Sequence, residues 1–132
     1  MNNGQPRGKY NNTKVQLPSG EKFDSVKEYE RWRELLFLQH AGVISDLQRQ
    51  VEFELIPPQT ETYARYGKNG NRIKDGTRTV EHAVKYVADF VYMKDGEKVV
   101  EDIKSNMTQK LPEYVIKRKL MLYLKGIKIL QT

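Results

Sequence analysis

The sequence YVADFVYMKDGEKVVEDIK, residues 86–104, contains the clearest structural signal in the chain. Two apolar segments flank Asp95-Gly96, a dipeptide typical of the two-residue type I′ turn of a β-hairpin. We therefore expect strands over Val84 to Met93 and Lys98 to Lys104. The first strand is apolar on both faces, as in the centre of a sheet, except at Asp89.

The turn also predicts which residues of the two strands face each other. With a two-residue loop, Lys94 pairs with Glu97, and Asp89 then lies directly opposite Asp102 on the same face of the sheet. Cβ atoms of opposed residues are about 4.5–5.5 Å apart, and like charges there are destabilising. At about 5 Å and an effective dielectric constant of about 20, the repulsion is on the order of 3 kcal/mol.

A divalent cation between the two carboxylates would compensate for this repulsion, and Lys104 lies one step along the same face. Two alternatives stay open at this point. The face could be exposed to solvent, where Asp and Lys side chains are simply hydrated. A three-residue loop would shift the pairing and separate the two carboxylates.

Outside this hairpin, Gly, Pro and apolar periodicity divide the chain into further elements of a single domain over residues 13–132. Residues 1–12 are interpreted as a flexible basic arm, and residues 60–82 as an extended basic hairpin tip or a mobile loop. The other predicted elements are a small hairpin over Thr13 to Phe23, a helix from Asp24 or Ser25 to about Ala41, a strand around Val51 to Leu55, a second helix from Pro112 to Gly126, and a strand over Ile127 to Leu130. Their order is typical of an α/β or α+β sandwich of one sheet and flanking helices.

The composition excludes several classes of protein. The 132 residues include no cysteine, so disulfides and thiolate metal sites are ruled out. His40 and His82 are isolated, which argues against a zinc site. No apolar run approaches the roughly 18 residues of a membrane helix. The net charge of +6 favours a polyanionic partner such as nucleic acid.

The first helix carries a carboxylate on its apolar side. A helical wheel places Glu28 in the arc of Trp32 and Leu35, where an unpaired carboxylate is costly. Ser25-x-x-Glu28 also fits a capping box, in which the glutamate turns back to the helix start. Both roles stay open. The residues predicted to point outward are Lys27, Arg31 and Glu34.

The second helix and the 60–82 segment carry most of the candidate DNA contacts. An apolar stripe at helical spacing is expected to face the core, and it consists of Ile116, Leu120, Tyr123 and Leu124. The candidate phosphate-binding residues are Lys110, Lys117 and Arg118 near this helix, and Arg65, Arg72, Lys74 and Arg78 in the 60–82 segment. A solvated helix face and a polar, mobile tip are the respective alternatives.

A helix-borne Glu28, a strand Asp89 and Asp102-x-Lys104 on the next strand together resemble the PD-(D/E)XK nuclease superfamily. The predicted order of elements also matches the αβββαβ core of that superfamily. The chain is similar, more closely, to small phage-encoded proteins of this group. The matching segments are FDSVKEYERW (23–32), GVISDLQRQVEFEL (42–55), YVADFVY (86–92) and VVEDIKS (99–105).

The resemblance implies a restriction-endonuclease-like core, with a central mixed sheet flanked by helices, and a role for each matched residue. Asp89 and Asp102 would hold Mg²⁺, which Mn²⁺ could replace, and Lys104 would lie beside the scissile phosphate. Glu28 would bind a metal-bound water or a second ion. Gln50 resembles an accessory glutamine of some relatives. Ala88 departs from the pattern, because the superfamily name has proline there.

The function implied is a Mg²⁺-dependent, phage-type endodeoxyribonuclease that hydrolyses DNA phosphodiester bonds. Among the relatives, Holliday-junction resolvases act as homodimers in the cytoplasm of the bacterial host, in phage or prophage recombination. An enzyme without branch preference, or one that serves packaging, is equally compatible with the sequence. The alternatives from other classes are a non-catalytic nucleic-acid-binding module that kept the fold, and a structural or regulatory phage protein.

Overall fold

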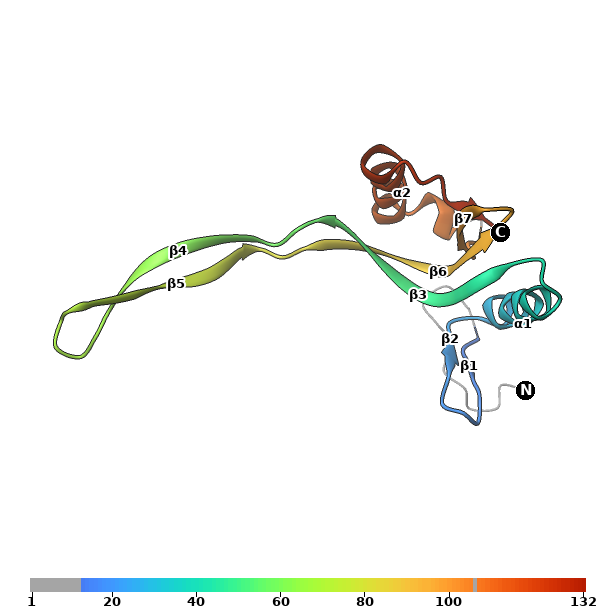
Figure 1. Cartoon of the computed structure of the whole chain (residues 1–132), viewed down its shortest axis with the longest axis horizontal. Helices are drawn as coiled ribbons and strands as arrows, with labels where there is room; N and C mark the ends of the chain where they lie inside the picture. The colour runs from blue at the N-terminus through green and yellow to red at the C-terminus, as the bar shows by residue number, and fades with distance from the viewer. Residues whose placement is uncertain (1–12, 106) are drawn as a thin grey trace.

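The structure is a computed structural model that describes residues 13–105 and 107–132 (Figure 1). The predicted basic arm, residues 1–12, lies outside this range. The elements are β1 (Val15–Gln16), β2 (Lys22–Phe23), α1 (Val26–His40), β3 (Ser45–Ile56), β4 (Gln59–Tyr66), β5 (Arg72–Glu81), β6 (Val84–Lys94), β7 (Glu97–Asp102), a 3₁₀ turn (Thr108–Lys110), α2 (Pro112–Lys125) and β8 (Leu130–Gln131).

A four-stranded mixed sheet in the order β3-β6-β7-β8 forms the centre of the molecule. β6 runs antiparallel to both β3 and β7, and β8 is parallel to β7 after the crossover through α2. The helices α1 and α2 lie on opposite sides of this sheet (Figure 1). The protein is therefore α+β. The last strand begins at Leu130, three residues later than predicted, because Ile127 and Ile129 instead pack into the core.

The local signals that bound the helices act as predicted. Ser25 caps α1, its Oγ accepting a hydrogen bond from the Glu28 N–H at 3.1 Å. Gly42 follows this helix with φ 81°, and Gly126 ends α2 with φ 66°, both in the left-handed region that favours glycine. Pro112 occupies the first turn of α2, where its missing N–H costs nothing.

The 60–82 segment forms a two-stranded antiparallel ribbon with two register shifts, which corresponds to the extended hairpin of the two alternatives. β4 and β5 pair only with each other and project far from the body as a continuation of β3 and β6 (Figure 1). Tyr63 lies across from Gly76, where an added Cβ would come within 2.4 Å of the tyrosine ring. The missing side chain at Gly76 thus gives the ring its place on the ribbon.

The predicted apolar stripe of α2 does not face the core, and that prediction is wrong. Tyr114 and Met121, one heptad apart, are the buried residues of this helix. Ile116, Tyr123 and Leu124 are exposed, and only Leu120 packs partly against the core. The helix face with more apolar residues is therefore exposed to solvent, because the Tyr114 ring and the Met121 side chain occupy the space above the sheet.

In both β3 and β6, the regular alternation of side chains between the two faces of the sheet is interrupted at one position. Side chains of a regular strand alternate, so Ala88 and Phe90 should share a face. Ala88 instead packs in the cluster with Met121 of α2, and Phe90 in the cluster with Leu35 of α1. The change lies at the pair formed by Gln50 and Asp89 in the β3–β6 register. This irregularity positions the site described next.

Candidate active site

Glu28 lies in the first turn of α1 and is buried, which confirms its predicted place among apolar residues. Its Oε2 accepts a hydrogen bond from the Asp24 N–H at 3.3 Å, so the carboxylate returns to the helix start as in a capping box, one residue earlier than that motif requires. Its Oε1 accepts a bond from Gln50 Nε2 at 3.3 Å and pairs with Arg49 at 3.5 Å. Glu28 therefore caps the helix and also faces the sheet.

Gln50 connects the helix to the central strand. Its Nε2 also donates to Asp89 Oδ1 at 3.4 Å, so one amide bridges the Glu28 and Asp89 carboxylates. Its φ of 51° lies in the left-handed region, which a non-glycine residue adopts at a cost of about 1–3 kcal/mol. Such strain gathers at functional sites because the surrounding structure must hold it in place.

The hairpin that carries Asp89 and Asp102 has the two-residue turn predicted from Asp95-Gly96. Asp95 and Gly96 both have positive φ, and Lys94 pairs with Glu97. The same register continues to Phe90 and Glu101, and Asp89 and Asp102 are the next residues of the two strands. They lie close enough for Asp102 to raise the pKa of Asp89, although the two side chains line different hollows. Asp89 Oδ2 accepts the Ile103 N–H at 2.8 Å.

The electrostatics of this pair follow from burial and proximity. Burial raises the pKa of the Asp89 carboxyl well above its ordinary value, and the neighbouring Asp102 and Glu28 carboxylates raise it further. Burial is also the main cause of the raised pKa of Glu28. The charged form of the Asp89 carboxyl is therefore disfavoured, and an added positive charge beside it would stabilise that form.

Asp102 is 2% exposed and is held by two side chains. Its Oδ2 accepts a hydrogen bond from the Tyr86 hydroxyl at 2.6 Å and pairs with Lys104 Nζ at 3.3 Å. Burial, followed by the charge of Asp102, raises the pKa of the Tyr86 hydroxyl, so this tyrosine remains a donor. The other oxygen, Oδ1, is buried without a hydrogen-bond partner among the residues that the structure describes.

Lys104 follows β7 and lies between the acidic pair and α2. Its Nζ is 4.8 Å from the centroid of the Tyr114 ring, a cation–π contact. The Tyr114 hydroxyl accepts a hydrogen bond from Gln131 Nε2 at 2.6 Å. Backbone bonds from the Lys104 N–H to Thr132 O and from the Thr132 N–H to Asp102 O continue the pairing with the C-terminal strand. The last residues of the chain therefore hold the Asp-x-Lys backbone.

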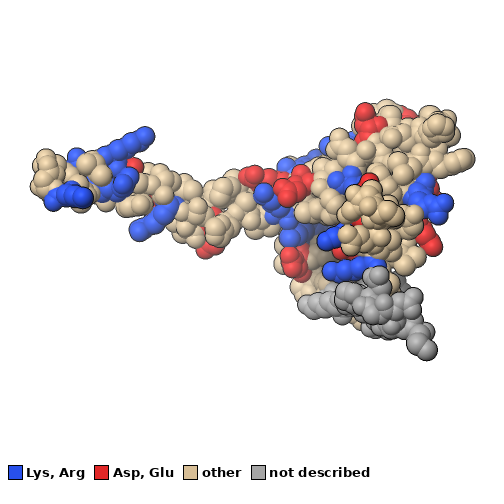
Figure 2. All heavy atoms as spheres, turned by 90° about the horizontal axis from the view of Figure 1, so that it is seen from below, with Lys and Arg blue, Asp and Glu red and all other residues tan. Residues whose placement is uncertain are grey.

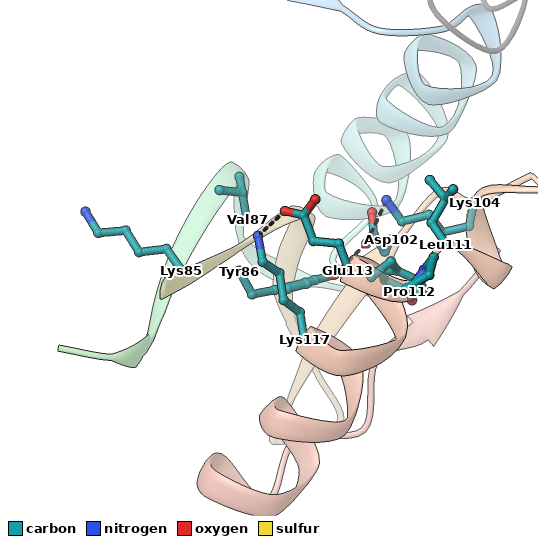
Figure 3. A pocket seen from close by; sticks show the side chains of 10 residues that line it. Lys85, Tyr86, Val87, Asp102, Lys104, Leu111, Pro112, Glu113 and Lys117 are labelled. Atoms are coloured by element: carbon teal, nitrogen blue, oxygen red, sulfur yellow. Dashed lines mark hydrogen bonds and ion pairs between the residues drawn. The ribbon is translucent and has the colours of Figure 1, made fainter. Parts of the chain in front are cut away.

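Two hollows meet at this lysine. One, of about 260 Å³, is lined by Glu28, Asp89, Ile103 and Lys104. The other, of about 460 Å³, lies between β6 and the start of α2 and contains Asp102 and Lys104 in its wall (Figure 3). Lys104 thus lines both hollows, whereas Asp89 lines only the smaller one and Asp102 only the larger one.

Comparison with protein families assigns the chain. A model of DUF1064, described as a protein family of unknown function, matches residues 7–128. The chain belongs to DUF1064. Neither curated proteins nor solved structures give a match. No helix in the described part of this DUF1064 chain is long and apolar enough to cross a membrane.

The fit of a divalent cation depends on two carboxylates. Within residues 13–105 and 107–132, no group of three or more His, Asp or Glu side chains forms a ready-made cation site. Mg²⁺ is commonly bound through only one or two carboxylates, with water and substrate oxygens completing the octahedron. Asp89 and Asp102, with the unpartnered Asp102 Oδ1, fit that demand. Glu28 is tied to Asp24, Gln50 and Arg49, which suits it to hold a water beside the cation.

The predicted DNA contacts separate into two groups. Lys117 and Arg118 are half-buried on α2, Lys117 in the wall of the larger hollow, whereas Lys110 is exposed in the preceding turn. The ribbon residues Arg65, Arg72, Lys74 and Arg78 lie far from the acidic pair. Figure 2 shows Lys and Arg atoms gathered along the outer part of this ribbon.

Three residues of the site were not predicted from the sequence. Tyr86 and Tyr114 look like ordinary core aromatics, yet they hold Asp102 and Lys104. Arg49 stacks 3.7 Å above the Phe23 ring centroid while pairing with Glu28.

The prediction that Arg31 points outward is wrong. Its guanidinium binds Glu101 through two hydrogen bonds of 2.8 Å, and the fully buried Glu101 also accepts a bond from the Tyr92 hydroxyl at 2.9 Å. The Glu101 carboxylate raises the pKa of Arg31. This cluster lies on the α1 side of the sheet and fastens the helix to β7.

Proposed function

We propose that this DUF1064 chain is a metal-dependent endodeoxyribonuclease that hydrolyses phosphodiester bonds in DNA. The observation that carries the proposal is the closeness of two carboxylates, the half-buried Asp89 and the buried Asp102, with Lys104 Nζ 3.3 Å from Asp102 Oδ2. An enzyme of this kind needs a cation-binding acidic pair and a nearby positive charge. A structural role alone gives no reason to keep two neighbouring carboxylates beside a lysine.

The order of elements supports the proposal. A helix, three antiparallel strands, a second helix and a parallel strand match the αβββαβ order of the PD-(D/E)XK superfamily. The four motif positions of that superfamily correspond to Glu28, Asp89, Asp102 and Lys104, which here come from α1, β6 and the end of β7. The ribbon adds a basic extension to this core.

Each side chain would have a separate task. Asp89 and Asp102 would hold the cation, Mg²⁺ or Mn²⁺. When bound, the cation would polarise a phosphoryl oxygen and lower the pKa of a water molecule. Lys104 would neutralise the negative charge that develops on the phosphate. Tyr86 fixes the Asp102 carboxylate, and Gln50 fixes Glu28 against Asp89.

The ribbon would supply substrate binding. A two-stranded β-ribbon fits the major groove of DNA, and Lys and Arg on it would contact phosphates. On four-way or otherwise branched DNA, two strands are cut symmetrically, so the enzyme would then act as a homodimer. Branch resolution in phage recombination or packaging is therefore the role that we propose for it in the bacterial cytoplasm.

The test is cleavage of supercoiled, linear, single-stranded and four-way-junction DNA in Mg²⁺. Asp102→Asn should lower the rate by about a thousandfold, because it keeps the shape of the side chain but removes the charge. Asp95→Asn, in the turn of the same hairpin, is the matched control and should cut as the parent does. Equal cleavage by the Asp102→Asn and parent proteins, or binding without any cleavage by the parent, would reject the enzyme in favour of a nucleic-acid-binding module.

A further inference from the structure

The hollow between β6 and the start of α2 has the size and chemistry of a ligand site. Its volume of about 460 Å³ lies within the range of about 300–1,000 Å³ that is typical of small-molecule pockets. It shares Asp102 and Lys104 with the candidate active site. A ligand in the hollow would therefore contact the group that faces the scissile phosphate.

The lining offers two kinds of surface. Lys117 places an ammonium group at the hollow in addition to Lys104, whereas Lys85 lines its edge with a side chain that extends away from it (Figure 3). Between them lies an apolar wall of Val87, Leu111 and Pro112. Phosphate groups bind Lys as a point charge, and the flat sides of a base or sugar pack on apolar surface. A nucleotide presents both features at once.

Within the described residues, Lys117 and Lys85 each form an ion pair with an exposed carboxylate. Lys117 Nζ lies 2.9 Å from Glu113 Oε1, and the Glu113 side chain is 80% exposed. Figure 3 shows this pair at the hollow. Lys85 Nζ lies 3.4 Å from Glu52, whose side chain is also exposed. Exposed ion pairs of this kind are weak, so a phosphate could take the place of either carboxylate.

We infer that this hollow binds one unpaired nucleotide of the cleaved strand, next to the scissile phosphate. The inference rests on the proposed function and names its substrate class. The volume of the hollow is sufficient for a single nucleotide. We place an unpaired nucleotide there, as in single-stranded DNA, a frayed end or the centre of a junction, because a base that packs on the apolar wall is separated from its partner strand.

The experiment measures the binding of a labelled five-nucleotide single-stranded DNA to the full chain in EDTA, by fluorescence anisotropy at several salt concentrations. Lys117→Ala should weaken binding severalfold and lower the salt slope by about 0.7, the value for one lost phosphate contact on a single strand. Glu113→Gln should tighten binding, because it removes the carboxylate that competes with phosphate. Lys119→Ala, on the same helix but outside the hollow, should change binding much less.

A second measurement locates the nucleotide. Amide NMR shifts at Val87 and Leu111 should change on adding the pentanucleotide to the parent and should be smaller with Lys117→Ala. The inference would be overturned if the amide shifts of Val87 and Leu111 did not change. It would also be overturned if the Lys117→Ala and Glu113→Gln proteins bound the DNA with the same affinity as the Lys119→Ala protein. Binding in EDTA is measured without cleavage. If the pentanucleotide did not bind at the hollow but Asp102-dependent cutting was intact, only the nucleotide site would be rejected. Binding at the hollow without any cutting would reject the nuclease alone.

Discussion

The body and the ribbon of this molecule use charged residues in opposite ways. In the body, the Arg31–Glu101 pair is bonded at 2.8 Å and its carboxylate is completely buried. On the ribbon, the Arg78–Glu61 pair is shorter, at 2.6 Å, but both side chains are about half exposed. Distance alone would rank the ribbon pair first. Burial reverses the ranking, because water screens the exposed pair and competes with it.

The same contrast separates chemistry from substrate binding. The body places few acidic groups next to each other at the end of two strands, where burial perturbs their protonation. The ribbon leaves every β4 residue exposed and most of β5 as well, so its arginines and lysines stay hydrated and available. A polyanion can approach such side chains without displacing a folded core.

The largest stability effect is expected from breaking the buried pair. Glu101→Ala leaves the half-buried Arg31 and the Tyr92 hydroxyl without their shared acceptor, and we expect a loss of about 3 kcal/mol in the free energy of unfolding. Glu61→Ala, which breaks the exposed ribbon pair, should cost less than about 1 kcal/mol. Urea unfolding of both proteins checks the comparison. Equal losses would show that the ribbon pair is not as solvated as its exposure indicates.

A smaller effect of opposite sign is expected at Asp89. Its pKa is raised in the folded protein, so its contribution to stability is present below its ordinary pKa and is lost as the pH rises towards the raised value. In EDTA, Asp89→Asn should therefore be more stable than the parent at pH 7.5, by about 2 kcal/mol, with the difference vanishing near pH 4. An asparagine can still accept the Ile103 N–H, so the fold is retained.

Adding Mg²⁺ should reverse this order. The cation binds the folded parent and raises its melting temperature, whereas Asp89→Asn gains little. Thermal melts with EDTA and with Mg²⁺ at pH 4.5, 6 and 7.5 provide the measurement. If Mg²⁺ raised the melting temperature of the Asp89→Asn protein as much as that of the parent, Asp89 would not be part of the cation site.

The smallest stability effect is expected from excising the ribbon. Ile56 pairs with Val84, so an Asn-Gly turn that joins these two residues would replace residues 57–83 without disturbing the sheet. The melting temperature should change by only a few degrees, because neither core cluster includes a residue of β4 or β5. DNA affinity should fall by about 10- to 100-fold, with a lower salt slope. A chain that unfolds on excision would contradict the independence of the two regions.

The hairpin turn shows what sequence can predict. Asp95-Gly96 adopts the two positive φ values of its turn type, and this local geometry sets the β6–β7 register as far as Phe90 and Glu101, next to Asp89 and Asp102. The caps of both helices are equally local. The candidate site is thus largely predictable, because its members are fixed by short-range turn and helix geometry.

Other features depend on packing across distant segments. The helix α2 buries Tyr114 and Met121 rather than its longer apolar stripe. The space above the sheet decides this choice, and a helical wheel gives no information about that space. Arg31 turns inward because Glu101 lies beneath α1, seventy residues later in the chain. The change of faces at Gln50 breaks strict alternation, and its signal is a backbone torsion rather than a residue pattern.

Single-turnover cleavage of a junction DNA in Mg²⁺ tests the division of labour between body and ribbon most directly. Three proteins are compared: the parent, Asp102→Asn, and the chain with residues 57–83 replaced by Asn-Gly. We expect Asp102→Asn to bind DNA but not cut it, and the ribbon-free chain to cut at near the parental rate once DNA is saturating. Cleavage by the Asp102→Asn protein would contradict a site built on Asp89, Asp102 and Lys104. A ribbon-free chain that cut no DNA at saturating concentration would contradict it as well.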